Sequence, residues 1–342
     1  MNAATHTLGI DIAKGNFEVN LRTLEPGQAR QSSSFPNNLK GFGALQGWLI
    51  QQGIRQASHL HACLESTSRY GDALAAWLLS QGYQLSMVNP RRTRHYADSQ
   101  LCRTTSDRID AAIIADFCAD QRDKLRLWEP LPKDHRQLQD LTRTRLALVE
   151  HQDGLANLLE SATGLARKAV QRQCANLQRE IQRLEQEIKK LLDQQPDSKL
   201  STQVALADSI PGVGLLTAAT VLAELPPIDS LEHVNQVIGL FGLDPKSKTS
   251  GSSVKTPARI SKMGSKRGRR ALYMPALVAL RCNPLIQALG HRLRAKGRTG
   301  KYIVVAAMRK LLRQIFGVVK NGKPFDPQWL NSPTTRPPQE VA

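Results

Sequence analysis

The sequence predicts an α/β N-terminal domain, a helical coiled-coil middle region and a mainly α-helical C-terminal domain. Three observations predict this order. Two apolar strands joined by a tight turn open the chain, strands and helices then alternate to about residue 125, and helical periodicity dominates from about residue 135. A length of 342 residues suits two or three domains at ~100–200 residues each. We expect domains at 1–125, 126–200 and 201–330, followed by a tail at 331–342.

The N-terminal elements follow from local patterns. Residues 7–13 (TLGIDIA) predict a buried strand, and the alternating residues 17–21 (FEVNL) predict its hairpin partner across the turn at 14–16. Further strands are expected at 59–64 and 83–88, and helices at 38–52, 70–81 and 106–121. Ser106 can cap the last of these helices, whose apolar side chains recur at helical spacing.

Residues 135–193 are helical by pattern. Within them, apolar residues recur at alternating spacings of four and three, which is typical of a heptad seam. The residues of this seam are Leu177, Ile181, Leu184, Ile188 and Leu191. Two arrangements fit the pattern: a helical hairpin packed on itself in the monomer, or a coiled coil that forms a dimer.

The charge is concentrated in one segment. The formal net charge is +18, and residues 246–323 carry 20 Lys or Arg and no Asp or Glu. The rest of the chain holds 27 of the 47 basic residues against all 29 acidic ones. Since basic side chains that neutralise phosphates release counterions, we expect a nucleic acid as partner, with a merely solubilising surface as the alternative. The candidate phosphate contacts are Lys246, Lys248, Lys255, Arg259, Lys262, Lys266, Arg267, Arg269 and Arg270.

Composition excludes several classes of protein. No stretch reaches the ~20 apolar residues of a membrane span, and Asp11 and Lys14 interrupt the one apolar run near the N-terminus, so no secretory signal is expected. The five cysteines include no C-x-x-C pair, which argues against a disulfide framework or a structural zinc site and suits a reducing cytoplasm. An aromatic content of 5% argues against recognition dominated by base stacking, which leaves duplex DNA and structured RNA.

The segment Ile-Pro-Gly-Val-Gly at 210–214 is similar to the turn of a helix-hairpin-helix element. Gly212 and Gly214 would let backbone N–H groups approach a phosphate near a helix N-terminus. An ordinary turn between two helices, using glycine for its backbone freedom, is the alternative.

Four carboxylates are distinguished by their positions. Asp11 interrupts the first apolar strand, Glu65 follows a later strand, and Asp107 and Asp110 lie three residues apart on one side of a predicted helix. Four such ligands can hold two Mg²⁺ ions ~3.5–4 Å apart, and Mn²⁺ would also fit. Each acid alone has an ordinary interpretation as a cap, a sheet-edge residue or a first-turn helix acid.

Eight motifs in order link the chain to a known family: GIDIAK, CLEST, TTSDRIDA, SIPGVG, GLFGLDP, SGSS, ISKMG and RRALYMPALVA. Over nearly its whole length the sequence resembles transposases of the IS110 insertion-sequence family, the DEDD recombinases guided by a bridge RNA. The resemblance implies a RuvC-like, ribonuclease-H-like N-terminal domain in which Asp11, Glu65, Asp107 and Asp110 bind the metal.

The resemblance also implies a nucleophile. It places the catalytic serine at the first Ser of SGSS, which is Ser250. Ser252 and Ser253 of the same motif are the alternative candidates for the nucleophile. Members often carry an aromatic residue two positions earlier, where this chain has Lys248, so the contacts around the nucleophile differ. The implied reaction forms a covalent phosphoserine link to DNA and then exchanges and rejoins strands between donor and target DNA. The tetrad and the serine would meet across protomers of a dimer or tetramer.

Three functions therefore compete. The first is an RNA-guided DNA transposase in a bacterial cytoplasm. The second is a metal-dependent junction nuclease that activates water and leaves Ser250 structural. The third is a non-catalytic nucleic-acid-binding scaffold.

Overall fold

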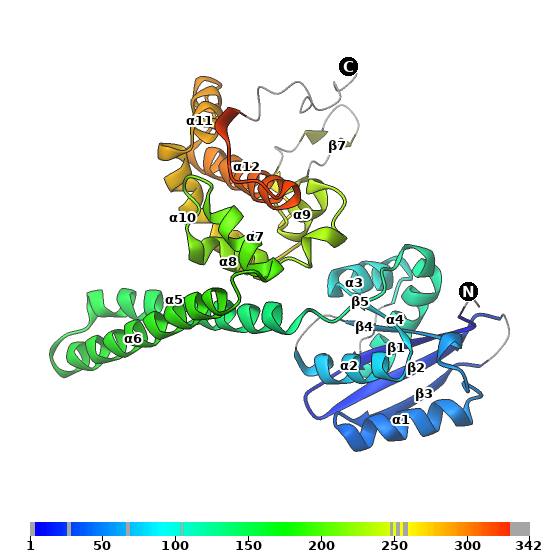
Figure 1. Cartoon of the computed structure of the whole chain (residues 1–342). Helices are drawn as coiled ribbons and strands as arrows, with labels where there is room; N and C mark the ends of the chain where they lie inside the picture. The colour runs from blue at the N-terminus through cyan, green and yellow to red at the C-terminus, as the bar shows by residue number, and fades with distance from the viewer. Residues whose placement is uncertain are drawn as a thin grey trace. The chain divides into compact units, whose positions relative to one another are not determined.

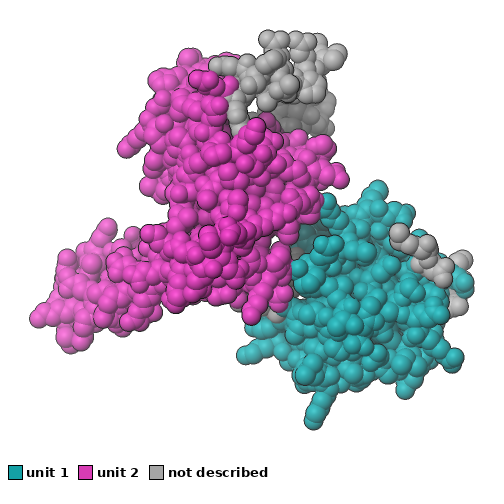
Figure 2. Space-filling view, viewed as in Figure 1, with its two compact units in different colours: residues 1–130 teal, residues 131–342 magenta. Residues whose placement is uncertain are grey.

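The computed structural model describes residues 4–25, 29–65, 69–102, 104, 106–246, 249–250, 254–255 and 259–328. The chain divides into two compact units, residues 1–130 and residues 131–342 (Figure 2). Each unit has its own hydrophobic core. None of the helices in the described ranges combines the length and apolar character that a membrane span requires.

Unit 1 is built on a mixed five-stranded sheet (Figure 1). Its strands are β1 (His6–Ile12), β2 (Asn16–Thr23), β3 (Gln31–Pro36), β4 (Leu60–Glu65) and β5 (Gln84–Val88). They lie in the order β3-β2-β1-β4-β5, in which β1, β2 and β3 are antiparallel neighbours while β4 and β5 run parallel to β1. The predicted hairpin and the predicted α/β class of this region agree with the structure.

Helices cover both faces of this sheet. The helices of unit 1 are α1 (Leu39–Gln51), α2 (Asp72–Ser80), α3 (Pro90–Ser99) and α4 (Asp107–Gln121), with 3₁₀ turns at Ala57–His59, Arg69–Gly71 and Arg122–Lys124. Apolar residues of α1 and α2, such as Leu45 and Leu78, share a core with Leu8 and Ile10 on one face. On the other face α4 packs directly against β1.

Two elements of unit 1 were not predicted, and both lack an apolar face. Strand β3 has the sequence QSSSFP and lies at the edge of the sheet, where only Phe35 is buried. Helix α3 has the sequence PRRTRHYADS and buries only Thr93. Because hydrophobic periodicity is the main local signal, elements that bury a single side chain leave little trace in the sequence.

Unit 2 begins with two long antiparallel helices, α5 (Lys133–Ser161) and α6 (Gly164–Gln194). They pack on each other within one chain, and seam residues Ile181 and Ile188 are buried. Of the two predicted arrangements, the hairpin packed on itself is the one present in the monomer. A coiled coil between two chains stays a prediction.

The remainder of unit 2 is mainly α-helical, as predicted. Its elements are α7 (Lys199–Asp208), α8 (Leu215–Ala223), a 3₁₀ turn (Ile228–Ser230), α9 (Val234–Leu240), α10 (Lys266–Cys282), α11 (Pro284–Ala295) and α12 (Gly300–Asn321). Two short ribbons pair β6 (Pro245–Lys246) with β9 (Arg259–Ile260) and β7 (Thr249–Ser250) with β8 (Val254–Lys255). Leu138 of α5 and Ile188 of α6 belong to the same core as these helices, so the hairpin base and the C-terminal helices fold together. The predicted tail at 331–342 lies outside the described residues.

Candidate metal site and nucleic-acid-binding surfaces

The sheet register brings two of the predicted acids together. Strand β1 runs parallel to β4, with Gly9 opposite Cys63 and Ile10 opposite Leu64. Continuing the register by one residue places Asp11 opposite Glu65. Because side chains alternate along a strand, Asp11 lies on the same face as Thr7 and Gly9, which is the face that α4 covers.

Helix α4 brings the other two acids to the same place. The Thr7 hydroxyl donates to the carbonyl oxygen of Ala115 at 3.2 Å, and an added Cβ on Gly9 would lie 2.1 Å from the carbonyl oxygen of Ala111. Thr7 thus lies against Ala115, and Gly9, two residues later on β1, lies against Ala111, four residues earlier on α4. Since four residues of a helix rise ~6 Å, about as far as two residues of a strand, the same spacing places Asp11 against Asp107. Asp110 lies one turn away on the same helix.

Electrostatics links Asp11 to the other three carboxylates. Burial, followed by the negative charges of Asp107, Asp110 and Glu65, raises the pKa of Asp11 to about 6. The pKa of Asp110 is also raised, first by burial and then by the charge of Asp107. Like charges that lie close together and are partly removed from water repel one another. A bound cation offsets this repulsion.

Oxygen ligands of this kind suit Mg²⁺ or Mn²⁺. Among the described residues, one group of three has ligand atoms that all lie within 4.8 Å of one another: His61, Cys63 and Cys118. No three of the four acids form such a group in this described part of the chain. The four acids therefore influence one another electrostatically, but among the described residues they do not form a compact group of ligand atoms. Their donor set fits hard divalent cations, which would activate an oxygen and stabilise a leaving oxygen.

One positioning contact was missed from the sequence. The hydroxyl of Thr93, on α3, is hydrogen-bonded to Oε1 of Glu65. Thr93 is buried, and its hydroxyl also lies 2.9 Å from the carbonyl oxygen of Pro90, so the start of α3 contacts the Glu65 carboxylate directly. The available signal was Asn89–Pro90, because Asn89 caps α3 and Pro90 occupies its first turn.

The predicted nucleophile lies in unit 2. Ser250 belongs to β7, where its backbone pairs with Val254 of β8. Its side chain, like that of Lys255, lies outside the described residues. Lys248, Ser252 and Ser253 lie outside them altogether. The role of Ser250 therefore stays a prediction.

The predicted basic contacts fall into two groups. Lys246, Arg259, Lys262 and Lys266 are exposed, and within the described ranges no acid forms an ion pair with them. The other described members are bonded to groups of the protein itself. Arg269 donates to the carbonyl oxygens of Phe241 and Gly264, while Arg270 pairs with Glu150 and with Asp153.

Arg267 is engaged with a carboxylate that sequence analysis did not single out. Glu224 has a side chain 3% exposed and accepts bonds from Arg143 (2.6 Å), Ser265 (2.8 Å) and Arg267 (3.1 Å). Burial by itself raises the pKa of Glu224, but Arg143, Ser265 and Arg267 together outweigh it and hold the pKa below its usual value. These residues come from α5, the end of α8 and the start of α10, so only the tertiary structure brings them together.

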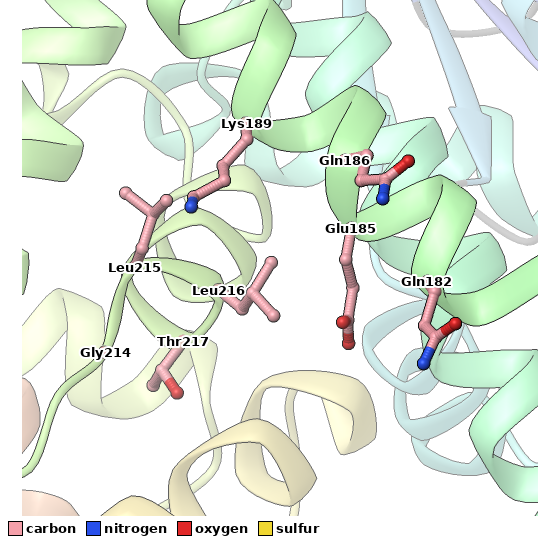
Figure 3. A pocket seen from close by; sticks show the side chains of 8 residues that line it. All are labelled: Gln182, Glu185, Gln186, Lys189, Gly214, Leu215, Leu216 and Thr217. Atoms are coloured by element: carbon pink, nitrogen blue, oxygen red, sulfur yellow. The ribbon is translucent and has the colours of Figure 1, made fainter. Parts of the chain in front are cut away.

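The two glycines of the predicted helix-hairpin-helix turn differ. Gly212 has φ +95° and packs against α10, since an added Cβ would lie 2.8 Å from Cα of Ala279. That close approach fits the alternative of an ordinary turn between helices. Gly214 has open space around it and precedes α8 at the edge of a pocket of about 750 Å³. Lys189 of α6 reaches across this pocket toward Leu215 (Figure 3). Phosphate contact at Gly214 stays a prediction.

Strand order and acid placement in unit 1 are compatible with a RuvC-like α/β domain that acts on nucleic acid. Residues 8–163 match the model of DEDD transposases of the IS110 type, and residues 204–291 match that of transposases of the IS116/IS110/IS902 family. The chain belongs to this transposase family. Membership implies that it binds DNA and cleaves and rejoins it, and the family resemblance predicted from the sequence is confirmed.

Curated relatives agree with this assignment. The pilin gene-inverting proteins of Moraxella lacunata and Moraxella bovis are each 31% identical to the chain over 327 residues, which cover 93% of this chain and 97% of the relative. The insertion element IS110 uncharacterized 43.6 kDa protein of Streptomyces coelicolor is 27% identical over 139 residues, 41% of this chain and 33% of that protein.

Proposed function

We propose that the chain is a DNA recombinase in which Asp11, Glu65, Asp107 and Asp110 hold two divalent cations, Mg²⁺ or Mn²⁺, and Ser250 is the nucleophile. One observation carries the metal part of the proposal. Three elements, β1, β4 and α4, bring four carboxylates within electrostatic reach, and burial together with the charges of the other three raises the pKa of Asp11 to about 6. A folded protein tolerates such repulsion between carboxylates where a bound cation offsets it.

The covalent step conserves the energy of the phosphodiester bond. The Ser250 hydroxyl loses its proton as its oxygen bonds to phosphorus, the P–O bond to the leaving strand breaks, and the leaving oxygen takes up a proton. Attack by the hydroxyl of another strand end then releases the serine. Because each new P–O bond replaces an old one, strand exchange proceeds without nucleotide hydrolysis.

The exposed basic residues supply the nucleic-acid contacts of this proposal. Lys246, Arg259, Lys262 and Lys266 would neutralise phosphates of donor and target DNA or of a structured guide RNA. Selection of the target by a bridge RNA, and assembly of tetrad and serine across protomers of a dimer or tetramer, rest on the family resemblance. The Moraxella relatives are named for inverting a pilin gene. Inversion, like transposition, requires DNA strands to be cut and rejoined to new partners.

Trapping the covalent intermediate tests this function. Wild-type protein, its co-purified RNA, Mg²⁺ and end-labelled DNA carrying the element ends should give protein–DNA adducts that survive denaturation. Ser250→Ala should give none, whereas the matched variants Ser252→Ala and Ser253→Ala should retain them. Asp11→Asn should retain nucleic-acid binding in a gel-shift assay and lose strand cleavage by about 10³-fold, a typical loss for removal of a catalytic group.

The outcomes separate the competing functions. Cleavage by Ser250→Ala at the wild-type rate would replace the serine mechanism with a metal-activated water, as in a junction nuclease. Wild-type cleavage by Asp11→Asn would refute the metal tetrad. Nucleic-acid binding without any metal-dependent cleavage would identify a scaffold.

A further inference from the structure

We propose that unit 1 contains a second metal site, formed by His61, Cys63 and Cys118, that takes one thiophilic divalent cation such as Zn²⁺. The ligand atoms of these residues all lie within 4.8 Å of one another. His61 is 3% exposed, and both cysteines are fully buried. The site is distinct from the carboxylate tetrad in ligand type and shares no residue with it.

The sheet and helix place these ligands by the same geometry that positions the acids. His61 and Cys63 alternate with buried neighbours along β4 and lie on the face that α4 covers, and Cys118 projects from α4 toward them. Sulfur and imidazole nitrogen at this spacing are the ligands that zinc prefers, whereas Mg²⁺ prefers oxygen.

The hydrogen bonds of His61 prepare it as a ligand. The Ser86 hydroxyl donates its one hydrogen to the carbonyl oxygen of Arg126 at 2.8 Å. The bond of 2.9 Å between Ser86 Oγ and His61 Nε2 must then be donated by Nε2. A neutral imidazole with its proton on Nε2 keeps a lone pair on Nδ1, and an outer partner of this kind is characteristic of metal-bound histidines.

Charge balance favours a divalent ion. Binding breaks two S–H bonds, forms two metal–sulfur bonds and transfers two protons to water. Two thiolates with one divalent cation are neutral overall, so the buried site gains no net charge, whereas a monovalent ion would leave a buried negative charge. Three protein ligands leave the fourth tetrahedral position to water.

The cation would join the two elements that carry the tetrad. Cys63 precedes Glu65 by two residues on the same face of β4, and Cys118 lies two helical turns from Asp110 on α4. A bond from β4 to α4 through the metal would hold strand and helix in register beneath the carboxylates. Sequence spacing argued against zinc because these ligands form no C-x-x-C motif and the third comes from a distant helix.

Cobalt titration tests the site. Co²⁺ bound by thiolates in tetrahedral geometry gives charge-transfer and visible ligand-field bands, which saturate at one ion per chain if the proposal is correct. The protein for this test is the full chain with Cys102, Cys174 and Cys282 replaced by Ala, so that Cys63 and Cys118 are its remaining thiols. The same protein, purified with zinc in the medium, should contain one zinc per chain.

Two variants provide the controls. Asp11→Asn should keep the thiolate bands, so this test does not depend on the tetrad. Cys63→Ser combined with Cys118→Ser should lose them. If that variant does not fold, the protein with Cys102, Cys174 and Cys282 replaced by Ala decides the question. Either of two results with it would overturn the proposal: an absence of thiolate bands at saturating Co²⁺, or a Cys63–Cys118 disulfide found by mass spectrometry after purification without oxidant.

Discussion

Two carboxylates withdrawn to different extents from water, Asp11 in unit 1 and Glu224 in unit 2, have opposite environments. Asp11 in unit 1 is surrounded by acids, and burial with their charges raises its pKa to about 6. Glu224 in unit 2 is more deeply buried, yet its contacts with Arg143, Ser265 and Arg267 hold its pKa below its usual value. The paired carboxylate stabilises the fold, whereas the unpaired group carries a cost that a ligand can offset.

The two carboxylates differ in the charges that surround them. A cation is supplied to Glu224 by the chain itself, through two arginines. For Asp11, the neighbouring charges that shift its pKa are the three acids. Among the described residues, unit 2 therefore supplies the cations that pair with Glu224, whereas the charges that raise the pKa of Asp11 in unit 1 are those of other acids.

The largest effect is expected for Glu224→Gln. Removing one partner of a buried ion pair leaves Arg143 and Arg267 without their shared carboxylate, and we expect the free energy of unfolding to fall by about 4 kcal/mol. Calorimetry of the full chain measures it. The matched control is Asp153→Asn at the exposed pair with Arg270, which should change stability by about 0.5 kcal/mol or less. If the two variants lowered the free energy of unfolding equally, the Glu224 ion pairs would contribute no more to stability than an exposed pair.

A smaller effect is expected for Gly9→Ala, which tests how unit 1 brings its acids together. The new Cβ would lie 2.1 Å from the Ala111 oxygen and 2.3 Å from the Ala115 nitrogen, so α4 must shift away from β1. We expect a loss of about 2–3 kcal/mol and weaker Mn²⁺ binding by titration calorimetry. Gly43→Ala in α1, where nothing lies within 4 Å, should instead stabilise the helix by about 0.5–1 kcal/mol. Unchanged Mn²⁺ affinity in Gly9→Ala would show that α4 does not contribute to the metal site.

The smallest effect is expected for Asp11→Asn without metal. Because the folded-state pKa of Asp11 is raised above its usual value of 3.8, its charge destabilises the fold above about pH 6, and this cost disappears as the pH falls below 3.8. Since the side chain is partly exposed, we expect the variant to be more stable by only about 1 kcal/mol at pH 8. Denaturant unfolding in EDTA at pH 8 and pH 4 measures the difference. A variant less stable than wild type at pH 8 would contradict the repulsion inferred for the tetrad.

Glu224 should show the opposite dependence on pH. Its pKa is lowered, so its contribution to stability is present above about pH 4.5 and is lost as the pH falls through its folded-state pKa. Measuring the free energy of unfolding of Asp11→Asn and Glu224→Gln across pH therefore distinguishes a carboxylate repelled by its neighbours from one paired with cations.

Sequence patterns predicted most of the fold where side chains alternate or recur around a core. Strands β1, β2, β4 and β5 and helices α1, α2 and α4 lie close to their predicted positions. Strand β3 and helix α3 escaped because each buries one side chain. With α3 unassigned, the contact between Thr93 and Glu65 could not be predicted.

The sequence by itself determined the family, the segment that carries the positive charge and the four acids, because these depend on residue identity and order along the chain. Only the tertiary structure decided which charges are already neutralised. Arg267 and Arg270, in a segment without acids, find Glu224, Glu150 and Asp153 from other elements. It also joined His61 and Cys63 to Cys118 across β4 and α4. Electrostatic and metal-ligand interactions depend on distance in space, and local periodicity carries no information about contacts between residues so far apart in the chain.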